Sequence, residues 1–179
     1  MSLATVETLE VMIGQPELQA RIEALAHEIH DQYAGEELLL VGVLKGSFLF
    51  LADLCRHLGP NVTVDFVQVS SYGDRKESSG VVQIRKDLDI NIEDRHVLLV
   101  EDIVDTGLTL QHLRELLAVR RPKSLRVVSL LSKPDARLHH TQIEWVGFEI
   151  ENEFVVGYGL DYAERYRNLP FIAKLHQAE

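Results

Sequence analysis

Apolar residues recur at helical spacing near the start of the chain. Between residues 16 and 35 they fall three or four positions apart, from Leu18 to Tyr33, which predicts an amphipathic helix. Pro16 suits the first turn of this helix, where a missing N–H is no loss, and Gly35 suits its end. One face of the helix is therefore expected to pack on a core.

The segments that follow have the pattern of strands separated by helices. Several runs are apolar on both faces, which is typical of central strands in a parallel sheet. A second helix is expected after Ser47, a favourable N-cap, and a third over residues 109–123. Alternating strands and helices predict an α/β domain with a mainly parallel sheet. The predicted strands cover residues 37–44, 62–72, 81–90, 95–103, 124–133, 143–150 and 154–160.

Residues 73–80 form a polar, charged stretch that begins and ends with glycine. Such a stretch is usually a surface loop, and the predicted strands on either side of it favour a hairpin. The sequence therefore predicts an antiparallel flap on the sheet, with a flexible loop over about residues 71–80.

Length and charge limit the classes of protein. The 179 residues fit one domain, and no repeat, low-complexity tract or linker divides residues 1–179. With 18 basic against 28 acidic residues the net charge is −10, which argues against a broad basic face for nucleic acid or a membrane surface. A small anionic ligand is not excluded, because a few well-placed hydrogen-bond donors can outweigh the electrostatic field of the net charge.

Cysteine content and hydropathy bear on the cellular compartment. Cys55 is the only cysteine, so no intrachain disulfide can form, and its apolar neighbours predict a small buried side chain. No apolar run reaches the roughly 18 residues that a membrane helix needs. The first residues also lack the pattern of a signal peptide. A cytoplasmic protein is expected.

The most informative motif covers residues 97–110 and reads VLLVEDIVDTGLTL. An apolar strand ends at Glu101 and Asp102, and a short loop leads into a helix. Ligands bind at such strand ends in parallel sheets, where backbone N–H groups and a helix N-terminus attract an anion. Gly107 permits close backbone approach, and Thr106 adds a hydroxyl donor.

Two interpretations of this motif stay open on the residues alone. An ordinary strand–helix connection with threonine capping explains the turn. The carboxylates of Glu101 and Asp102 favour a functional site, because they repel phosphate and need another partner, such as ribose hydroxyls or Mg²⁺. The glycine-rich loop of nucleotide triphosphatases is excluded because the motif lacks its terminal Gly-Lys-Ser/Thr. A dinucleotide fingerprint is excluded because no GxGxxG follows a strand.

The motif resembles the phosphoribosyl pyrophosphate motif of the type I phosphoribosyltransferases. Its Glu-Asp version resembles that of the hypoxanthine-guanine phosphoribosyltransferases. The similarity runs from about residue 38 to the C-terminus and includes VSSYG (69–73), LLSKP (130–134) and FVVGYGLDYAERYRNLPFI (154–172).

This resemblance implies both a fold and an activity. The fold is that of the type I phosphoribosyltransferases, an α/β class with a mainly parallel central sheet flanked by helices, a flexible antiparallel flap and a small hood over residues 150–179. The activity is transfer of 5-phosphoribosyl from phosphoribosyl pyrophosphate to N9 of hypoxanthine or guanine. This reaction releases pyrophosphate and gives IMP or GMP, as in purine salvage, with Mg²⁺ as cofactor.

The resemblance assigns the donor site residue by residue. Glu101 and Asp102 hold the ribose hydroxyls, directly or through Mg²⁺, and Asp105, the catalytic residue, faces N7 of the purine. The Leu44–Lys45 peptide bond can be cis in the family. On the residues alone, Asp105 could instead cap a helix and Lys45 could be a solvated turn lysine. The implied donor site comprises Lys45, Gly46, Glu101, Asp102, Asp105, Thr106, Gly107, Leu108, Thr109 and Arg167.

The resemblance also assigns the purine site. Lys133 donates to O6, an acceptor that hypoxanthine and guanine carry where adenine has an amino donor. Phe154 stacks on the purine face, although a phenylalanine in such a run is more often a core residue. Val155 meets the base edge through its backbone. Asp161 completes the implied purine site and lies near the Mg²⁺–pyrophosphate.

The resemblance also implies a metal site, a loop that closes over the active site, and an oligomeric state. Glu101, Asp102 and Asp161 surround Mg²⁺, and Ser71 and Tyr72 of the flexible loop close over the site. The family's dimers and tetramers imply a homodimer or homotetramer. Neither nucleic acid nor a membrane is an expected partner.

Two alternatives to this function stay open. A regulator with the same fold could bind nucleotides, and RNA, without turnover as its main task, although the acidic balance disfavours RNA. The same chemistry could also act on another base. Lys133 together with the pattern FVVGYGLDY (154–162) disfavours adenine, orotate and uracil, whereas xanthine shares the O6 acceptor.

Overall fold

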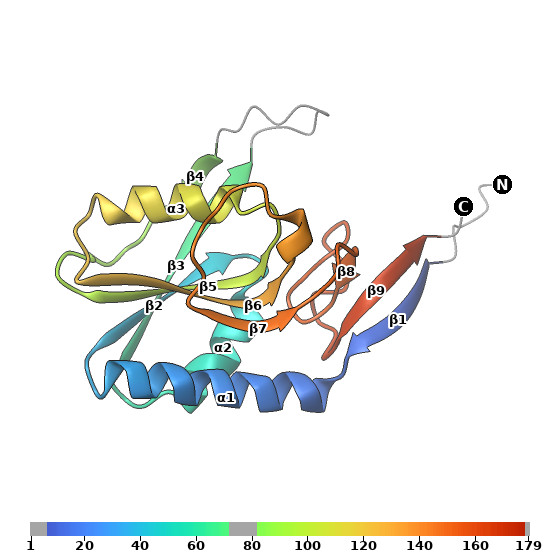
Figure 1. The fold of residues 1–179 in the computed structure, drawn as a ribbon, viewed down its shortest axis with the longest axis horizontal. Helices are drawn as coiled ribbons and strands as arrows, with labels where there is room; N and C mark the ends of the chain where they lie inside the picture. The colour runs from blue at the N-terminus through green and yellow to red at the C-terminus, as the bar shows by residue number, and fades with distance from the viewer. Residues whose placement is uncertain (1–6, 72–81, 178–179) are drawn as a thin grey trace.

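A six-stranded sheet forms the centre of the computed structural model, which describes residues 7–71 and 82–177 (Figure 1). Its strand order is β4-β3-β2-β5-β6-β7, and all neighbours pair in parallel except β3 and β4, which are antiparallel. This arrangement confirms the predicted α/β class. The strands are β2 (Leu38–Leu44), β3 (Val62–Ser71), β4 (Val82–Lys86), β5 (His96–Val104), β6 (Ser124–Ser132) and β7 (Trp145–Glu149).

Helices cover both faces of the sheet (Figure 1). The strand residues alternate between two cores, so Leu40 packs with α1 (Gln15–Tyr33) and α2 (Phe48–His57). Val41 packs on the opposite face with α3 (Leu108–Ala118). The apolar runs predicted as central strands are therefore buried on both sides. A short 3-10 helix, η1 (Pro134–Ala136), follows β6.

A second, smaller sheet forms a hood at one end of the molecule. It joins β1 (Glu7–Ile13), β9 (Ile172–Gln177) and β8 (Val155–Val156) in antiparallel pairs, so the first and last described strands lie side by side (Figure 1). The hydrophobic pattern does not predict β1 or β9. Their partners are distant in the sequence, and Val11 is 56% exposed, so β1 lacks a clear apolar face.

The predicted strand over residues 154–160 is wrong in length, because only two residues pair as β8. Gly157 and Gly159 have φ values of 98° and 100°, which extended strands do not adopt. Tyr158 between them is also left-handed, with φ 48°. The chain therefore turns back toward the end of β2 instead of continuing the hood.

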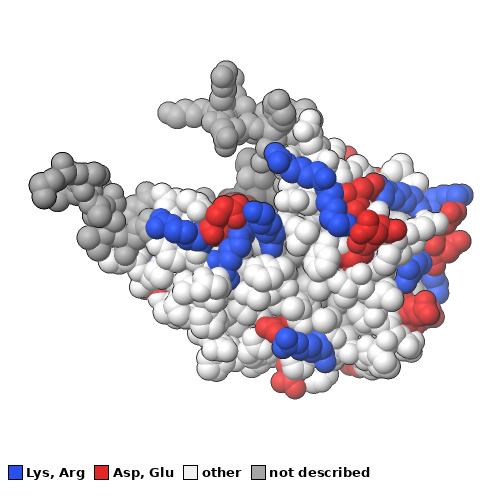
Figure 2. Space-filling view, turned by 180° about the vertical axis from the view of Figure 1, so that it is seen from behind, with Lys and Arg blue, Asp and Glu red and all other residues white. Residues whose placement is uncertain are grey.

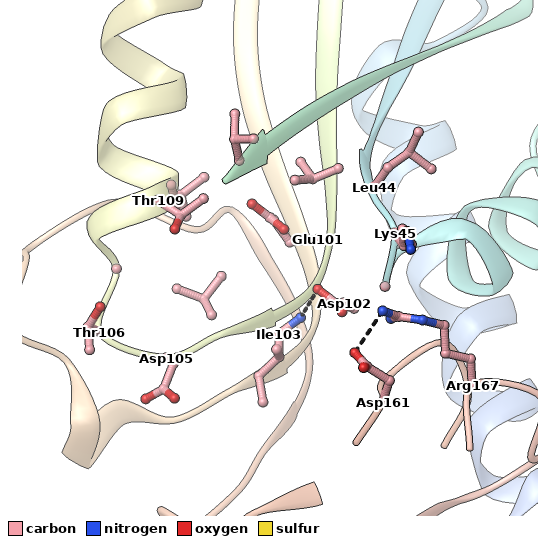
Figure 3. Close-up of a pocket in the computed structure, with 16 residues that line it drawn as sticks. Leu44, Lys45, Glu101, Asp102, Ile103, Asp105, Thr106, Thr109, Asp161 and Arg167 are labelled. Carbon is pink, nitrogen blue, oxygen red and sulfur yellow. Dashed lines mark hydrogen bonds and ion pairs between the residues drawn. The ribbon is translucent and has the colours of Figure 1, made fainter. Parts of the chain in front are cut away.

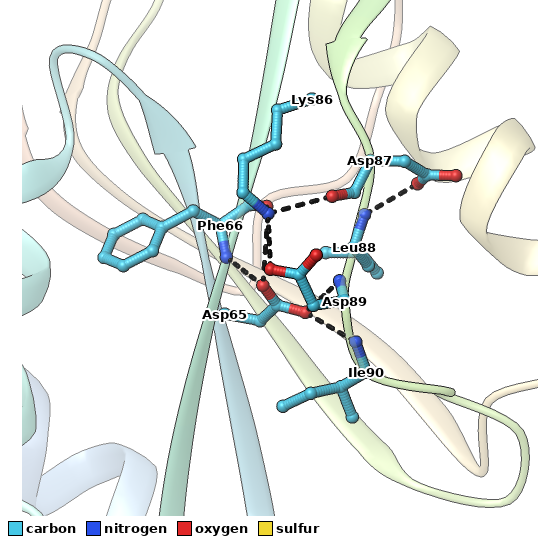
Figure 4. A network of polar contacts seen from close by, with 7 residues as sticks. All are labelled: Asp65, Phe66, Lys86, Asp87, Leu88, Asp89 and Ile90. Carbon is cyan, nitrogen blue, oxygen red and sulfur yellow. Dashed lines mark hydrogen bonds and ion pairs between the residues drawn. The ribbon is translucent and has the colours of Figure 1, made fainter.

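The strand predicted over residues 81–90 is shorter in the structure, where β4 covers Val82–Lys86. Asp65 of β3 explains the early end. Its buried carboxylate accepts the N–H groups of Asp89 and Ile90 at 2.8 and 2.9 Å, besides that of Phe66 at 2.7 Å (Figure 4). Those N–H groups are thus lost to strand pairing, and β4 stops at Lys86.

Lys86 completes this arrangement, which we call the Asp65 junction (Asp65, Lys86 and residues 87–90). Its ammonium lies 3.7 Å from the Asp65 carboxylate and donates to the Phe66 carbonyl at 3.1 Å (Figure 4). The β3–β4 register shifts beside this contact, between Gln68 and Val69. The junction therefore fixes the base of the predicted antiparallel flap. The tip of the flap, with Tyr72, lies outside the described residues.

Surface charge and helix hydropathy agree with the composition. On the face seen in Figure 2, lysine and arginine side chains stand next to aspartate and glutamate side chains rather than in one basic area. No helix in the described ranges is long and apolar enough to cross a membrane. Cys55 is half-buried in α2, less enclosed than predicted, and its thiol donates to the Ala52 carbonyl.

Candidate active site

A basin of about 340 Å³ opens at the carboxyl ends of β2 and β5 (Figure 3). This is the edge where parallel sheets bind ligands. The structure brings ten of the predicted site residues to its wall: Lys45, Gly46, Glu101, Asp102, Asp105, Thr106, Gly107, Thr109, Asp161 and Arg167.

The other predicted residues do not line the basin or have side chains outside the described part of the chain. Leu108, Lys133, Phe154 and Val155 are not among the residues that line it. Ser71 is the last residue of β3, and its side chain, like all of Tyr72, lies outside the described structure.

The loop after β5 has the geometry of an anion site. Gly107, with φ 85°, immediately precedes α3, and a Cβ at this position would lie 2.6 Å from the His139 carbonyl. Only glycine fits there. Asp105 is therefore not the N-cap, and Thr109 belongs to the first turn of α3 rather than to the loop. The N-terminal N–H groups of the helix begin at the basin wall.

The loop after β2 packs tightly against β5. A Cβ on Gly46 would lie 1.5 Å from Oδ2 of Asp102, so glycine is required for this contact. The Leu44–Lys45 peptide bond is cis, the state that the sequence left open. The carbonyl of Gly46 in turn meets Gly159, where a Cβ would approach it to 1.9 Å. Two glycines thus bring three segments of the chain together below the basin.

Glu101 is buried and Asp102 is half-buried at the end of β5. Burial, together with the charge of Asp102, raises the pKa of Glu101 well above its usual range. Burial also raises the pKa of Asp102 to about 6, although the Ile103 N–H and the Arg167 charge oppose this shift. Adjacent strand residues point to opposite faces, so the two carboxylates leave β5 in different directions. Both are short of positive partners.

This uncompensated charge suits a divalent cation that arrives with a ligand. Within the described ranges, no three carboxylate, histidine or cysteine side chains are arranged to hold a metal by themselves. Mg²⁺ commonly takes one or two carboxylates and completes its shell with water and substrate phosphates. Asp102 and Glu101 fit that mode of binding, because their surroundings disfavour the charged carboxylates and a bound cation would supply a counter-charge.

Substituting Glu101 by glutamine should stabilise the ligand-free protein. Its pKa is higher in the folded than in the unfolded chain, so its ionised form lowers the free energy of unfolding as pH rises above about 4.5. We expect Glu101→Gln to raise the free energy of unfolding by about 1–3 kcal/mol at pH 8, and by much less at pH 4. Urea titrations at both pH values measure this difference.

Glu115→Gln provides the control for this prediction. Glu115 is exposed on α3, and its carboxylate accepts a hydrogen bond from the Gln111 side chain. Equal stability of Glu101→Gln and wild type at pH 8 would show that the Glu101 carboxyl is not destabilising.

Arg167 and Asp161 face one another across the hood side of the basin. Nη2 of Arg167 lies 2.8 Å from Oδ1 of Asp161 (Figure 3). Nη1 of Arg167 donates to the Gly159 carbonyl at 2.8 Å. Nε of Arg167 is buried without a hydrogen-bond partner in the described part of the chain. The guanidinium is thus held in place at the basin wall, and a planar fork of donors suits paired oxygens of an anion.

Lys133 and Asp105 form an ion pair next to the basin. Nζ of Lys133 lies 3.4 Å from Oδ2 of Asp105, and Lys133 itself is only 7% exposed. Its N–H donates to the Val104 carbonyl at 3.0 Å, which fixes the lysine where β6 ends. A donor and a carboxylate therefore stand side by side at one edge of the site.

Phe154 and Val155 lie in the hood, where Val155 is the first residue of β8. Phe154 is 53% exposed, which rules out the alternative that it is a core residue, and its ring meets Tyr162 edge to face. The Phe154 carbonyl accepts the Leu175 N–H of β9 at 3.2 Å. Because backbone groups alternate along a strand, Val155 turns its own N–H and C=O away from β9. β8 is an edge strand, so no second strand pairs with these groups in the described part of the chain.

Two residues that the sequence did not single out also belong to the site. Arg137 donates through Nε to the Asp105 carbonyl at 3.2 Å and through Nη2 to Ser132 at 2.9 Å, and so braces the Asp105 backbone. Glu164 holds the Lys45 ammonium, with both carboxylate oxygens 3.1 Å from Nζ. Lys45 is thus a turn lysine, 53% exposed, that has an acidic partner. No local pattern marks Glu164, because 119 residues separate it from Lys45.

Comparison with known proteins agrees with this geometry. The family model for the phosphoribosyl transferase domain matches residues 12–163. The fold and the site thus define the chain as a phosphoribosyltransferase.

Individual relatives narrow this class. Hypoxanthine phosphoribosyltransferase of Escherichia coli K12 is 49% identical over 170 residues, which cover 94% of this chain and 96% of that protein. Hypoxanthine-guanine phosphoribosyltransferase of Mycobacterium avium is 52% identical, over 92% of this chain and 84% of its own. The solved structure of a Bacillus anthracis hypoxanthine-guanine phosphoribosyltransferase has a TM-score of 0.89 and 47% identity, and covers 92% of this chain and 97% of that one. The chain belongs to the hypoxanthine-guanine phosphoribosyltransferase family, whose members are glycosyltransferase-type enzymes.

Proposed function

We propose that this chain transfers 5-phosphoribosyl from phosphoribosyl pyrophosphate to N9 of hypoxanthine or guanine, giving IMP or GMP and pyrophosphate. The observation that carries the proposal is the Lys133–Asp105 pair, with 3.4 Å between ammonium and carboxylate. In a 6-oxopurine, O6 and N7 are neighbours on one edge. A lysine donor and an aspartate at this spacing match O6 and N7 together.

Base selection follows from the chemistry of the ammonium group. Lys133 has donors only, so it pairs with the O6 acceptor of a 6-oxopurine and leaves the adenine amino group without a partner. Its burial makes such a mismatch costly. The exposed face of Phe154 supports stacking on the base, and the outward backbone of Val155 supports contact with its far edge.

The donor would lie along the basin. The loop of residues 106–109 supplies N–H and hydroxyl groups for the 5′-phosphate. Glu101 and Asp102 are suited to the ribose hydroxyls. The pyrophosphate would meet Lys45, the Gly46 backbone and Arg167, whose buried Nε lacks another partner.

The carboxylates around the basin suit Mg²⁺ as the cofactor. We assign Asp102, Glu101 and Asp161 to hold it, together with oxygens of the substrate. When bound, the ion neutralises charge that develops on the leaving pyrophosphate. Asp161 already contacts Arg167 at 2.8 Å, so the carboxylate also keeps the guanidinium facing the same leaving group.

The chain's own residues then have three chemical tasks. C1′ passes through an oxocarbenium-like state, as in glycoside chemistry, and the carboxylates of Glu101 and Asp102 stabilise the positive charge that develops on the ribosyl group. Lys45 and Arg167 stabilise the leaving group. Asp105 holds or moves the purine proton at N7.

Further assignments concern the compartment, the assembly and the flexible loop. We infer that the enzyme works in the cytoplasm, as a homodimer or homotetramer, without nucleic acid or a membrane as partner. Ser71 and Tyr72 are assigned to a loop that excludes water from the reactive donor.

A panel of bases tests the proposal. Pyrophosphate release is measured with Mg²⁺ and phosphoribosyl pyrophosphate, separately with hypoxanthine, guanine, xanthine and adenine. We expect rapid release with hypoxanthine or guanine. Activity with adenine alone, or with no base, would contradict the assignment.

Substituting Lys133 by glutamine should relax the selection against adenine. The amide can accept as well as donate, so the ratio of kcat/KM for hypoxanthine over adenine should fall by about 10- to 100-fold. Lys123→Gln is the matched control, because Lys123 is an exposed lysine whose ammonium pairs with Glu36 at 3.2 Å, away from the basin. An unchanged ratio would mean that Lys133 does not contact position 6.

A further inference from the structure

The two cations assigned to pyrophosphate already share an acidic partner. Both oxygens of Glu164 lie 3.1 Å from Nζ of Lys45, and Oε2 also lies 3.3 Å from Nη2 of Arg167. Glu164 thus bridges the loop after β2 and the hood segment that carries Arg167. Its carboxylate presents to these cations the same kind of oxygen pair that a diphosphate would present.

The backbone around Glu164 is built to hold this position. Ala163 and Glu164 both have left-handed φ values, 51° and 63°, which residues other than glycine adopt rarely. The Glu164 N–H donates to Oδ2 of Asp161 at 2.9 Å. Such strained conformations persist only where the surrounding structure enforces them. The contact with Lys45 is therefore specified by the fold of this turn.

The same contact is easily broken. The side chains of Glu164 and Lys45 are 65% and 53% exposed, so water can replace either partner at little cost. Lys45 and Arg167 hold the pKa of Glu164 below its usual range, so the carboxylate is charged at neutral pH. Arg167 would keep its bond to Asp161 if Glu164 left. Departure of Glu164 would thus free the Lys45 ammonium and one contact of the guanidinium.

We propose that Glu164 sets the affinity for the diphosphate group. Its carboxylate occupies Lys45 and Arg167 in the ligand-free chain and leaves them when pyrophosphate or the diphosphate of phosphoribosyl pyrophosphate binds. This inference rests on the proposed function, which assigns that diphosphate to these two residues. Because carboxylate and diphosphate compete for the same donors, Glu164 weakens diphosphate binding and speeds pyrophosphate release.

The test is calorimetric titration of the full-length chain with magnesium pyrophosphate at low and high salt. Glu164→Gln keeps the shape of the side chain and removes its charge. We expect it to bind pyrophosphate about 3- to 10-fold more tightly than wild type at low salt, with the gain shrinking in about 1 M salt. Product inhibition by pyrophosphate should strengthen by the same factor.

Glu28→Gln is the control, because Glu28 is an exposed glutamate paired with Arg21 at 2.9 Å on α1, remote from the basin. It should bind as wild type does. Unchanged or weaker binding by Glu164→Gln would overturn the inference, and weaker binding would show that Glu164 orients Lys45 toward the ligand. Failure of wild type itself to bind pyrophosphate would instead overturn the proposed function on which the inference rests.

Discussion

Substituting Asp105 by asparagine should lower kcat by about 10²- to 10⁴-fold, the range over which general acid–base groups contribute. The amide keeps the shape of the side chain but cannot hold or move the purine proton. Asp105 is exposed to the basin, and its backbone is braced by Arg137 and its side chain by Lys133, so the substitution should leave the loop in place. The KM for phosphoribosyl pyrophosphate should change only a few-fold.

Steady-state kinetics with both substrates varied measures this separation. Asp135→Asn is the matched control, because Asp135 is an exposed aspartate of η1, close to Lys133 in the chain. If kcat stays the same and donor affinity falls, Asp105 positions the donor and is not the catalytic residue.

Substituting Asp65 by asparagine should destabilise the fold more than any other change considered. Three backbone N–H groups, at 2.7 to 2.9 Å, share this buried carboxylate. An amide would turn an NH₂ group toward at least one of them and would leave Lys86 without its buried counter-charge. We expect a loss of about 3 kcal/mol, since a broken buried charge contact typically costs 3–5 kcal/mol.

Thermal and urea unfolding measure this loss, which corresponds to a midpoint lower by roughly 6–12 °C for a chain of this size. Asp89→Asn is the control, because that side chain is 82% exposed and contacts Lys86 from the solvent side. A shift no larger than that of the control would show that the Asp65 junction does not stabilise the base of the flap.

Local sequence patterns were sufficient to predict the central strands of the molecule. Residues 38–44 are apolar without interruption, so the burial of β2 on both faces can be predicted without knowing its partners. The motif of residues 97–110 is contiguous, and its strand, turn and helix position its own side chains. For this reason Glu101, Asp102, Asp105, Thr106, Gly107 and Thr109 of the motif reach the wall of one basin.

The features that local patterns missed depend on partners far apart in the chain. β1 pairs with β9 across more than 150 residues, as Thr8 opposite His176 shows, and no short window contains that information. Lys45 meets Glu164 in the same way. The early end of β4 follows from Asp65, which accepts N–H groups 24 and 25 residues away. Tertiary contacts override local preference at each of these places.

The central claim is transfer, and the stoichiometry of one reaction tests it most directly. The chain is mixed with Mg²⁺, phosphoribosyl pyrophosphate and hypoxanthine, and nucleotide and pyrophosphate are followed together. We predict that both products form at equal initial rates, and that neither forms when the base is omitted. Pyrophosphate without nucleotide, or bound nucleotide with no turnover, would contradict the account.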